Sequence, residues 1–160
     1  MIMNGKSLFT AIFFVLLTVS LSAQLVVDEE GLYYDENKEL YTGSYIEFYS
    51  NGNKRVELQL KNGRKDGEVI LYFENGTRNE IRSYRDGKMD GTWTTWNEEG
   101  IKTAVANYSD NLKHGDWFIW DDNGTLRFEM HYRSGRKNGI WKMYDETGEL
   151  IAEESKDEQG

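Results

Sequence analysis

Short apolar stretches alternate with polar, glycine-containing turns over most of the chain. Each stretch is about seven or eight residues long and is rich in Tyr, Trp, Phe, Ile and Val, the residues that favour β-strands. Apolar and polar residues also alternate within a stretch. Phe128, Met130 and Tyr132 fall on one side of an extended strand, whereas Glu129 and His131 fall on the other. This pattern predicts antiparallel strands with one half-buried face.

Two features depart from this simple alternation. Glu80 and Arg82 occupy the apolar positions of their strand while Ile81 lies out of phase, so this strand is the least regular. In other strands, aromatic residues such as Trp93 and Trp96 lie three positions apart and would point to opposite faces of a regular strand. Either both faces of the sheet carry aromatic residues, or a bulge between them restores a single face.

Glycines divide this region into repeats of 24 residues, the mark of a repeat architecture. Each repeat has an opening glycine and a second glycine nine residues later. The opening glycines are Gly43, Gly67, Gly91, Gly115 and Gly139, and the second series is Gly52, Gly76, Gly100, Gly124 and Gly148. A third series, Gly63, Gly87 and Gly135, has Asn111 in its remaining slot. Asparagine tolerates the left-handed backbone conformation, so the substitution fits a turn that glycine otherwise makes.

The turns predict one β-hairpin in each repeat. Asn-Gly at 51–52, 75–76 and 123–124, between two apolar stretches, is a strong hairpin signal. The links between repeats read "KNGRKDG", "RDGKMDG", "SDNLKHG" and "RSGRKNG", which predicts longer turns with two positions suited to positive φ. Proline is absent, so nothing interrupts backbone pairing. The sequence therefore predicts an all-β fold, an elongated antiparallel sheet of stacked hairpins.

The chain is expected to have four parts. Residues 1–23 have the features of a signal peptide: a positive charge at Lys6, then an uncharged, helix-forming stretch too short to span a bilayer, then small residues. Residues 24–42 are a tyrosine-rich N-terminal capping segment, residues 43–148 are the repeat domain, and residues 149–160 are an acidic C-terminal cap and tail. We therefore expect export to the periplasm, cell envelope or medium, with membrane attachment only through an uncleaved signal. Charges at the C-terminal end discourage strand pairing between molecules and predict a monomer.

Composition excludes several classes of protein. The chain has 28 acidic and 19 basic residues and a formal net charge of -9, which disfavours nucleic-acid binding. It has no cysteine, which excludes disulfides, thiol nucleophiles and zinc–thiolate sites. The two histidines, His114 and His131, are expected in a turn and on the polar side of a strand. No hydrolase, metalloprotease or phosphate-loop motif occurs. We predict no catalytic, cofactor-binding or metal-binding residues, and a protein that is not an enzyme.

Acidic residues collect in the hairpin turns and basic residues in the links. The three residues before the second-series glycines include seven acids and no base: Glu74, Glu98, Glu99, Asp121, Asp122, Asp145 and Glu146. In the links, basic residues outnumber acidic ones. Because the two kinds of turn lie at opposite ends of the strands, the sheet is expected to have one acidic and one relatively basic long edge. The separation either keeps molecules soluble and apart, or it docks a charged partner.

The repeats resemble those of the MORN-repeat variant family, whose units read roughly as G-x-W-x-x-Y-x-x-N-G. The motif is carried by "GTWTTWNEEG", "GDWFIWDDNG" and "GIWKMYDETG", with "GSYIEFYSNG" and "GEVILYFENG" as weaker copies. The resemblance covers residues 43–148, and "GLYYDENKELYTG" looks like the family's lead-in. Many bacterial members are identified as YwqK-type antitoxins. The resemblance implies an elongated antiparallel sheet whose recurring residues are mostly structural.

Two functions are compatible with these observations. The first is an exported, non-enzymatic interaction module that binds a protein or a cell-envelope polymer, and the second is an antitoxin-like protein that neutralises a partner. The tryptophans are expected to contact one another from repeat to repeat as one ladder, with one side left exposed for binding. The candidate interaction surface consists of Trp93, Trp96, Trp117, Trp120, Trp141, Tyr144, Arg64, Lys65, Arg136 and Lys137.

Overall fold

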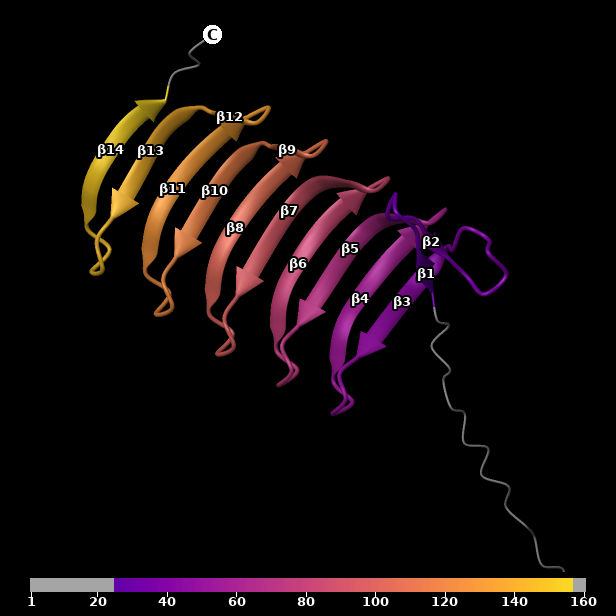
Figure 1. Cartoon of the computed structure of the whole chain (residues 1–160). Helices are drawn as coiled ribbons and strands as arrows, with labels where there is room; N and C mark the ends of the chain where they lie inside the picture. Colours follow the sequence, from indigo (N-terminus) through magenta and orange to yellow (C-terminus); the bar gives the residue numbers. More distant parts are fainter. Residues whose placement is uncertain (1–24, 157–160) are drawn as a thin grey trace, which may run out of the picture.

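The protein is all-β and is dominated by one long antiparallel sheet, as predicted (Figure 1). The computed structural model describes residues 25–156, so the expected signal segment 1–23 and the last residues of the tail lie outside the described residues. The sheet strands are β3 (Gly43–Phe48), β4 (Lys54–Lys61), β5 (Arg64–Tyr72), β6 (Arg78–Arg85), β7 (Lys88–Trp96), β8 (Lys102–Ser109), β10 (Gly115–Trp120), β11 (Leu126–Arg133), β13 (Gly139–Tyr144) and β14 (Leu150–Lys156). Each strand pairs with the one that follows it in this order.

Four short strands complete the fold. β9 (Leu112–Lys113) pairs with β8, and β12 (Arg136–Lys137) pairs with β11, so both extend turns between repeats. β1 (Val26–Val27) and β2 (Tyr33–Tyr34) form a separate two-stranded sheet near the N-terminal end. Within residues 25–156, a search for helices long and apolar enough to cross a membrane found none.

The strand register assigns the two tryptophan columns to opposite faces of the sheet. Trp117 lies opposite Met130, whereas its neighbour Phe118 lies opposite Glu129 and therefore points to the other face. A bulge follows Ile119 in this hairpin, and the other four hairpins have one at the same position. The extra residue lies in the second strand of each hairpin, so the alternation in the first strand continues unbroken. Both faces of the sheet thus carry aromatic residues.

We call the face that carries Trp93, Trp117 and Trp141 the ladder face, and the opposite one the reverse face. The register also explains the irregular strand β6. Glu80 and Arg82 form an ion pair on the ladder face, and the Arg82 guanidinium lies 5.2 Å from the centroid of the Trp93 ring. Cation–aromatic contact replaces the apolar packing expected there.

The links between repeats are tight two-residue turns rather than the longer turns expected. Their two central residues have positive φ throughout, as at Asp110 (52°) and Asn111 (69°), which is the type I′ geometry. The Asn-Gly hairpin turns are longer. The Gly52 N–H donates to the Tyr49 carbonyl and the Tyr49 N–H to the Asn53 carbonyl, and of the residues between them only the glycine has positive φ.

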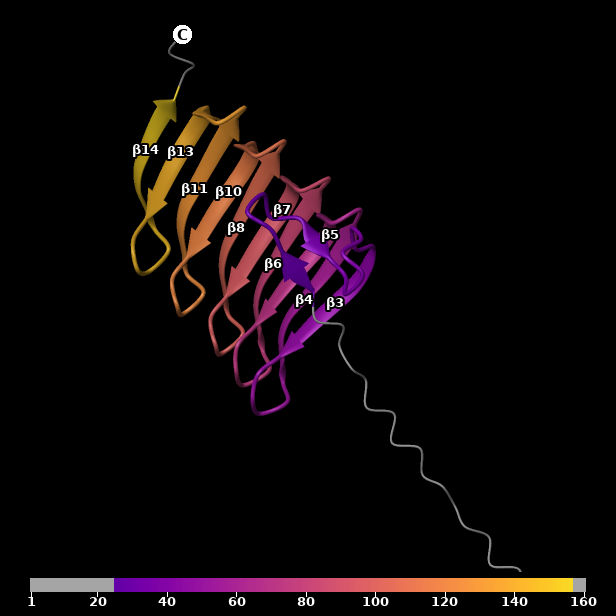
Figure 2. The same cartoon turned by 45° about the vertical axis from the view of Figure 1, so that its right-hand side comes forward.

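The two kinds of turn lie along opposite long edges of the sheet (Figures 1 and 2). On the link edge, backbone hydrogen bonds join each turn to the preceding link: Gly87 N–H to Lys65 O, Asn111 N–H to Met89 O and Gly135 N–H to Lys113 O, at 2.8–2.9 Å. On the hairpin edge, side-chain amides join each turn to the next one, as when Asn51 Nδ2 donates to the Glu74 carbonyl at 2.8 Å. Each repeat is thereby tied to its neighbours alone.

The sheet has little interior. Among the described residues, four apolar side chains are buried: Leu58, Leu60, Val69 and Tyr132. Residues 25–42 cover the first three of these, because Leu25, Tyr33 and Tyr41 pack against them from the ladder face. Backbone hydrogen bonds from Tyr33 N–H to Gly63 O (2.9 Å) and from Gly63 N–H to Tyr41 O (2.8 Å) hold the segment in place. Figures 1 and 2 show β1 and β2 in front of β3–β5, with the rest of this face uncovered.

Candidate interaction surfaces

The tryptophans do not form one ladder. On the ladder face, three tryptophans alternate with three tyrosines, and consecutive ring centroids lie 4.8–5.7 Å apart in the order Tyr84, Trp93, Tyr108, Trp117, Tyr132 and Trp141. Each indole N–H also donates to a backbone carbonyl of the preceding strand: Trp93 to Ser83 (3.2 Å), Trp117 to Asn107 (3.0 Å) and Trp141 to His131 (3.1 Å). These three residues fasten neighbouring strands together, which is a structural role.

Trp96, Trp120 and Tyr144 lie on the reverse face. The Trp120 ring lies 5.8 Å from the Phe118 ring and 5.7 Å from the Lys102 ammonium. Within residues 25–156, neither the Trp96 nor the Trp120 indole N–H donates a hydrogen bond to another residue. The two half-buried indole N–H groups on this face are therefore left for a partner.

Cations cover the exposed side of the ladder near the link edge. The Lys113 ammonium lies 4.4 Å from the Trp117 ring centroid and 4.8 Å from that of Tyr132, and Lys137 lies 4.4 Å from Trp141. Burial beside the Tyr84 ring lowers the pKa of Lys65, and the nearby Arg82 charge adds to this effect. A cationic ligand such as a quaternary ammonium would meet like charges over these rings, so the ladder is a poor site for one.

The ten candidate residues thus separate into three groups. Trp93, Trp117 and Trp141 share the ladder face with Lys65 and Lys137, which lie over aromatic rings there. Trp96, Trp120 and Tyr144 lie on the reverse face. Arg64 and Arg136 are exposed at the link edge, where Arg64 Nε lies 3.6 Å from Asp86 Oδ1.

The ladder face is hollowed at its C-terminal end, a feature that the sequence reasoning missed. The hollow has a volume of about 310 Å³ and lies between β10 and β14. Its apolar lining comes from Ile119, Phe128, Met130, Trp141, Met143 and Ala152, and Lys142, Glu153 and Glu154 border it. Ile119 is 38% exposed and Met143 is 40% exposed. The sequence does contain a signal for the hollow. The residues two positions after Trp117 and Trp141 are the apolar Ile119 and Met143, whereas the residue two positions after Trp93 is the polar Thr95.

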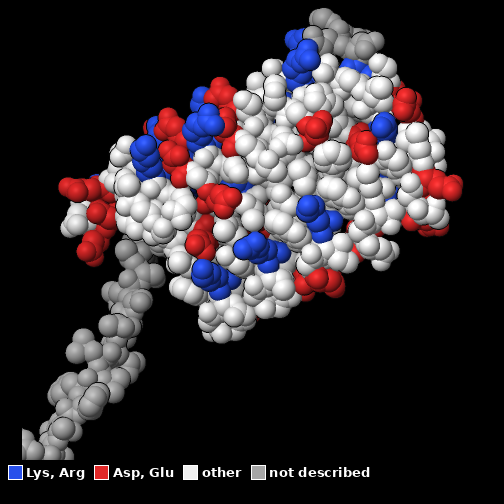
Figure 3. All heavy atoms as spheres, turned by 180° about the vertical axis from the view of Figure 1, so that it is seen from behind, with Lys and Arg blue, Asp and Glu red and all other residues white. Residues whose placement is uncertain are grey.

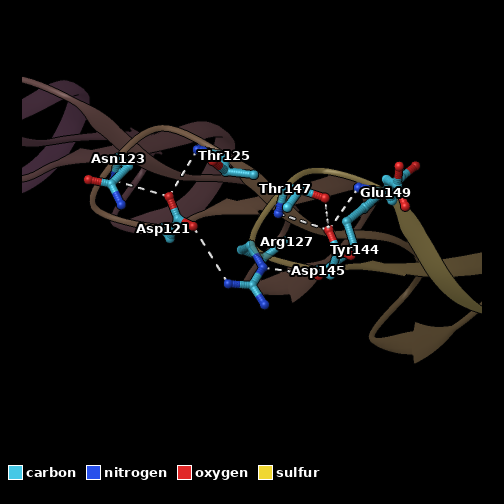
Figure 4. A network of polar contacts seen from close by, with 8 residues as sticks. All are labelled: Asp121, Asn123, Thr125, Arg127, Tyr144, Asp145, Thr147 and Glu149. Carbon is cyan, nitrogen blue, oxygen red and sulfur yellow. Dashed lines mark hydrogen bonds and ion pairs between the residues drawn. The ribbon is translucent and has the colours of Figure 1, made fainter.

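Two carboxylates of the acidic hairpin edge accept hydrogen bonds within their own turns (Figure 4). Asp121 Oδ1 accepts the Asn123 and Thr125 N–H groups at 3.0 and 2.9 Å, and Asp145 Oδ1 accepts those of Thr147 and Glu149 at 2.8 and 2.9 Å. Hydrogen bonds from the Thr147 hydroxyl and from backbone N–H groups lower the pKa of Asp145. These two carboxylates therefore shape the turns.

Ion pairs further reduce the charge contrast between the edges. Arg127 joins two hairpin turns, because its Nε donates to the Tyr144 carbonyl at 3.0 Å and its Nη1 lies 3.6 Å from Asp121 Oδ2 (Figure 4). On the link edge, Arg85 pairs with Asp90 at 2.8 Å. Seen from behind, Lys and Arg lie among Asp and Glu rather than in a field of one sign (Figure 3). The geometry favours apolar contact over a purely charged edge as the means of binding.

The histidines lie where the sequence placed them. His114 Nδ1 accepts the Ser134 N–H at 3.4 Å in a link turn, a role that Asp90 Oδ2 has one repeat earlier with the Asp110 N–H. His131 lies on the reverse face, with Nδ1 2.7 Å from Asp116 Oδ1. Among the described residues, no group of three or more His, Asp or Glu side chains could hold a metal ion.

Comparison with known families gives the identity of the repeats. The sequence profile described as MORN repeat variant matches residues 41–62, 65–86, 113–134 and 137–155, which together make up more than half of the chain. The chain belongs to the MORN repeat variant family. The profile passes over residues 87–112, yet β7 and β8 pair in the same register as the other hairpins, so the structure contains five MORN repeats.

MORN repeats are commonly protein- or membrane-binding modules, which is compatible with an interaction scaffold. A search of curated proteins found no match to this chain.

Proposed function

We propose that this protein is a non-enzymatic, exported scaffold that binds a partner protein or cell-envelope polymer through the faces of its sheet. The observation that carries the proposal is the concentration of exposed apolar side chains on a sheet one layer thick. In the last two repeats these include Ile119, Ile140, Met143, Leu150 and Ile151, which are 38–58% exposed. Exposed apolar groups gathered in this way are typical of interaction surfaces.

The binding test compares the two faces. Wild-type protein, a ladder-face variant (Ile119→Thr with Met143→Thr) and a reverse-face variant (Trp96→Thr with Trp120→Thr) are used to capture partners from the producing cell. We expect one variant to lose a partner that the wild type and the other variant retain, with unchanged far-ultraviolet circular dichroism in both. If both variants retain every partner of the wild type, neither face is the binding surface and the proposal fails.

Export is tested by fractionation of a tagged protein. The charge and length pattern of residues 1–23 supports a cleaved signal, so we expect the mature chain, starting near Gln24, in the envelope or the medium. A variant with Leu16→Arg and Leu17→Arg, which interrupts the apolar stretch, should remain in the cytoplasm. Recovery of the wild type in the cytoplasm with Met1–Ala23 intact would refute export.

An antitoxin-like role is the second candidate, supported by the resemblance to YwqK-type proteins. It requires the protein to meet its target before export or without it. Co-expression with the captured partner distinguishes the two: an antitoxin restores growth that the partner alone arrests, whereas an exported scaffold has no such effect.

A further inference from the structure

We propose that the hollow on the ladder face binds an extended segment of a partner protein through large apolar side chains, much as residues 25–41 cover the first repeats. The proposal rests on the scaffold function and names its binding site and partner class. The partner segment carries two aromatic or aliphatic anchors.

The lining of the hollow repeats a surface that the chain itself covers. Moving 72 residues along the chain, or three repeats, takes Val56, Leu58, Val69 and Leu71 to Phe128, Met130, Trp141 and Met143. All eight positions lie on the ladder face in equivalent pairs, since Leu58 lies opposite Val69 and Val56 opposite Leu71, and Phe128 lies opposite Met143. The structure thus presents the same apolar columns twice.

The two surfaces differ in what lies over them. At the first, Leu25, Tyr33 and Tyr41 pack against the columns and leave Leu58 5% exposed and Val69 4% exposed. At the second, the Lys137 and Lys156 ammonium groups lie over the Trp141 ring, but no apolar segment among residues 25–156 provides this cover, and Met143 is 40% exposed. The chain therefore demonstrates which chemistry fits these columns: an extended segment that places leucine and tyrosine side chains on them.

The middle of the ladder face does not continue either surface. There the equivalent positions hold the Glu80–Arg82 ion pair and the small side chains of Ala104 and Ala106. A segment bound at the hollow would gain most of its apolar contact over β10–β14, because in the middle of the face the second-strand positions are charged or small and only the ladder rings remain. The hollow is consequently a separate site of limited length, suited to a short segment.

The border of the hollow carries charges of both signs. Glu153 and Glu154 lie at its rim together with Lys142, and Lys156 pairs with Glu154 and lies 5.9 Å from the centroid of the Trp141 ring. The border therefore favours neither a strongly basic nor a strongly acidic segment, whereas the net charge of -9 on the whole chain would repel an anionic lipid surface. The apolar lining also lacks the converging polar groups that a sugar polymer needs.

A labelled synthetic peptide tests the proposal. The probe is "GLYYNQNKQLY", the sequence of residues 31–41 with Asp35, Glu36 and Glu39 replaced by Asn, Gln and Gln so that the acidic chain does not repel it, and binding to the full mature chain is followed by fluorescence anisotropy. We expect saturable binding that weakens at least tenfold in Met143→Glu and is unchanged in the reverse-face variant Trp120→Thr. A peptide with the two leucines and three tyrosines replaced by serine should not bind.

Several outcomes overturn the proposal. Equal affinity for wild type and Met143→Glu would mean that the peptide binds elsewhere, for example by displacing the chain's own residues 25–41. Binding to phosphatidylcholine vesicles that is lost in Met143→Glu would instead make the hollow a lipid site. If the reverse-face variant alone loses its cellular partner and the probe does not bind, the scaffold function stands and this inference falls.

Discussion

The contrast between Trp117 and Trp120 makes the sharpest test of the fold. Both are half-buried tryptophans in β10, three positions apart, and both lie against another aromatic ring. Only Trp117 donates its indole N–H to a backbone carbonyl, that of Asn107 at 3.0 Å. Replacing each with phenylalanine keeps an aromatic ring at both positions and removes a hydrogen bond at one.

The expected cost follows from these contacts. The smaller ring loses roughly 1 kcal/mol of apolar burial at either position. Trp117→Phe additionally loses the hydrogen bond to the Asn107 carbonyl, which keeps the His114 N–H as its other donor, and this loss costs about 1 kcal/mol more. We therefore expect Trp117→Phe to lower the free energy of unfolding by about 2 kcal/mol, and Trp120→Phe by about 1 kcal/mol.

Urea unfolding followed by circular dichroism measures the difference. With a denaturant slope of about 2 kcal/mol/M, the midpoint of Trp117→Phe should lie roughly 0.5 M below that of Trp120→Phe. The pair Trp93→Phe and Trp96→Phe repeats the comparison one repeat earlier, where Trp93 donates to Ser83 at 3.2 Å. Equal midpoints within both pairs, or a larger loss on the reverse face, would refute the assignment of the two columns.

Three further predictions follow from the turns and the sheet edge. At Gly91 (φ 103°) an added Cβ would lie 3.0 Å from Ser83 Cβ, whereas at Gly100 (φ 81°) it would meet nothing within 4 Å. In urea unfolding, Gly91→Ala should therefore lower the free energy of unfolding by about 2–3 kcal/mol, and Gly100→Ala by about 1 kcal/mol. Because the folded state lowers the pKa of Asp145, its contribution to stability is present above about pH 4 and is lost as the pH falls through the folded pKa. In Asp145→Asn, the urea midpoint should fall less between pH 5 and pH 2 than it does in the wild type. The turn should be kept, since Asn97 Oδ1 accepts the Ile101 N–H in an equivalent turn at 2.9 Å. An equal fall in wild type and variant would exclude Asp145 as the source of the pH dependence. The protein should be monomeric in light scattering, and Glu153→Thr with Glu154→Thr should promote association through β14; a wild-type dimer would contradict the capping argument.

The 24-residue period and the hairpins could be predicted because glycine marks the positions where the backbone has positive φ. Residues at positive φ recur at fixed intervals, and Asn111 at 69° occupies the slot that the spacing assigned to a turn. The faces of the two tryptophan columns could not be predicted in the same way. They depend on which strand of each hairpin holds the bulge, and the residue concerned, such as Arg127, has no special sequence signature.

The hollow escaped prediction for a different reason. Ile119, Met130 and Met143 look like ordinary core positions when each column is considered alone. Whether such a column is buried depends on what the rest of the chain lays over it, and residues 25–42 reach only the first repeats. Tertiary cover, rather than local pattern, distinguishes the buried surface from the open one.

The small number of buried side chains affects how the stability of the protein depends on temperature. Unfolding a protein raises its heat capacity mainly by exposing buried apolar surface, by about 12–15 cal/mol/K per residue in ordinary globular domains. Here four apolar side chains are buried among the described residues, so the increment per residue should be smaller. The free energy of unfolding should then vary only gently with temperature, and the array should remain folded in the cold as well as it does at moderate heat.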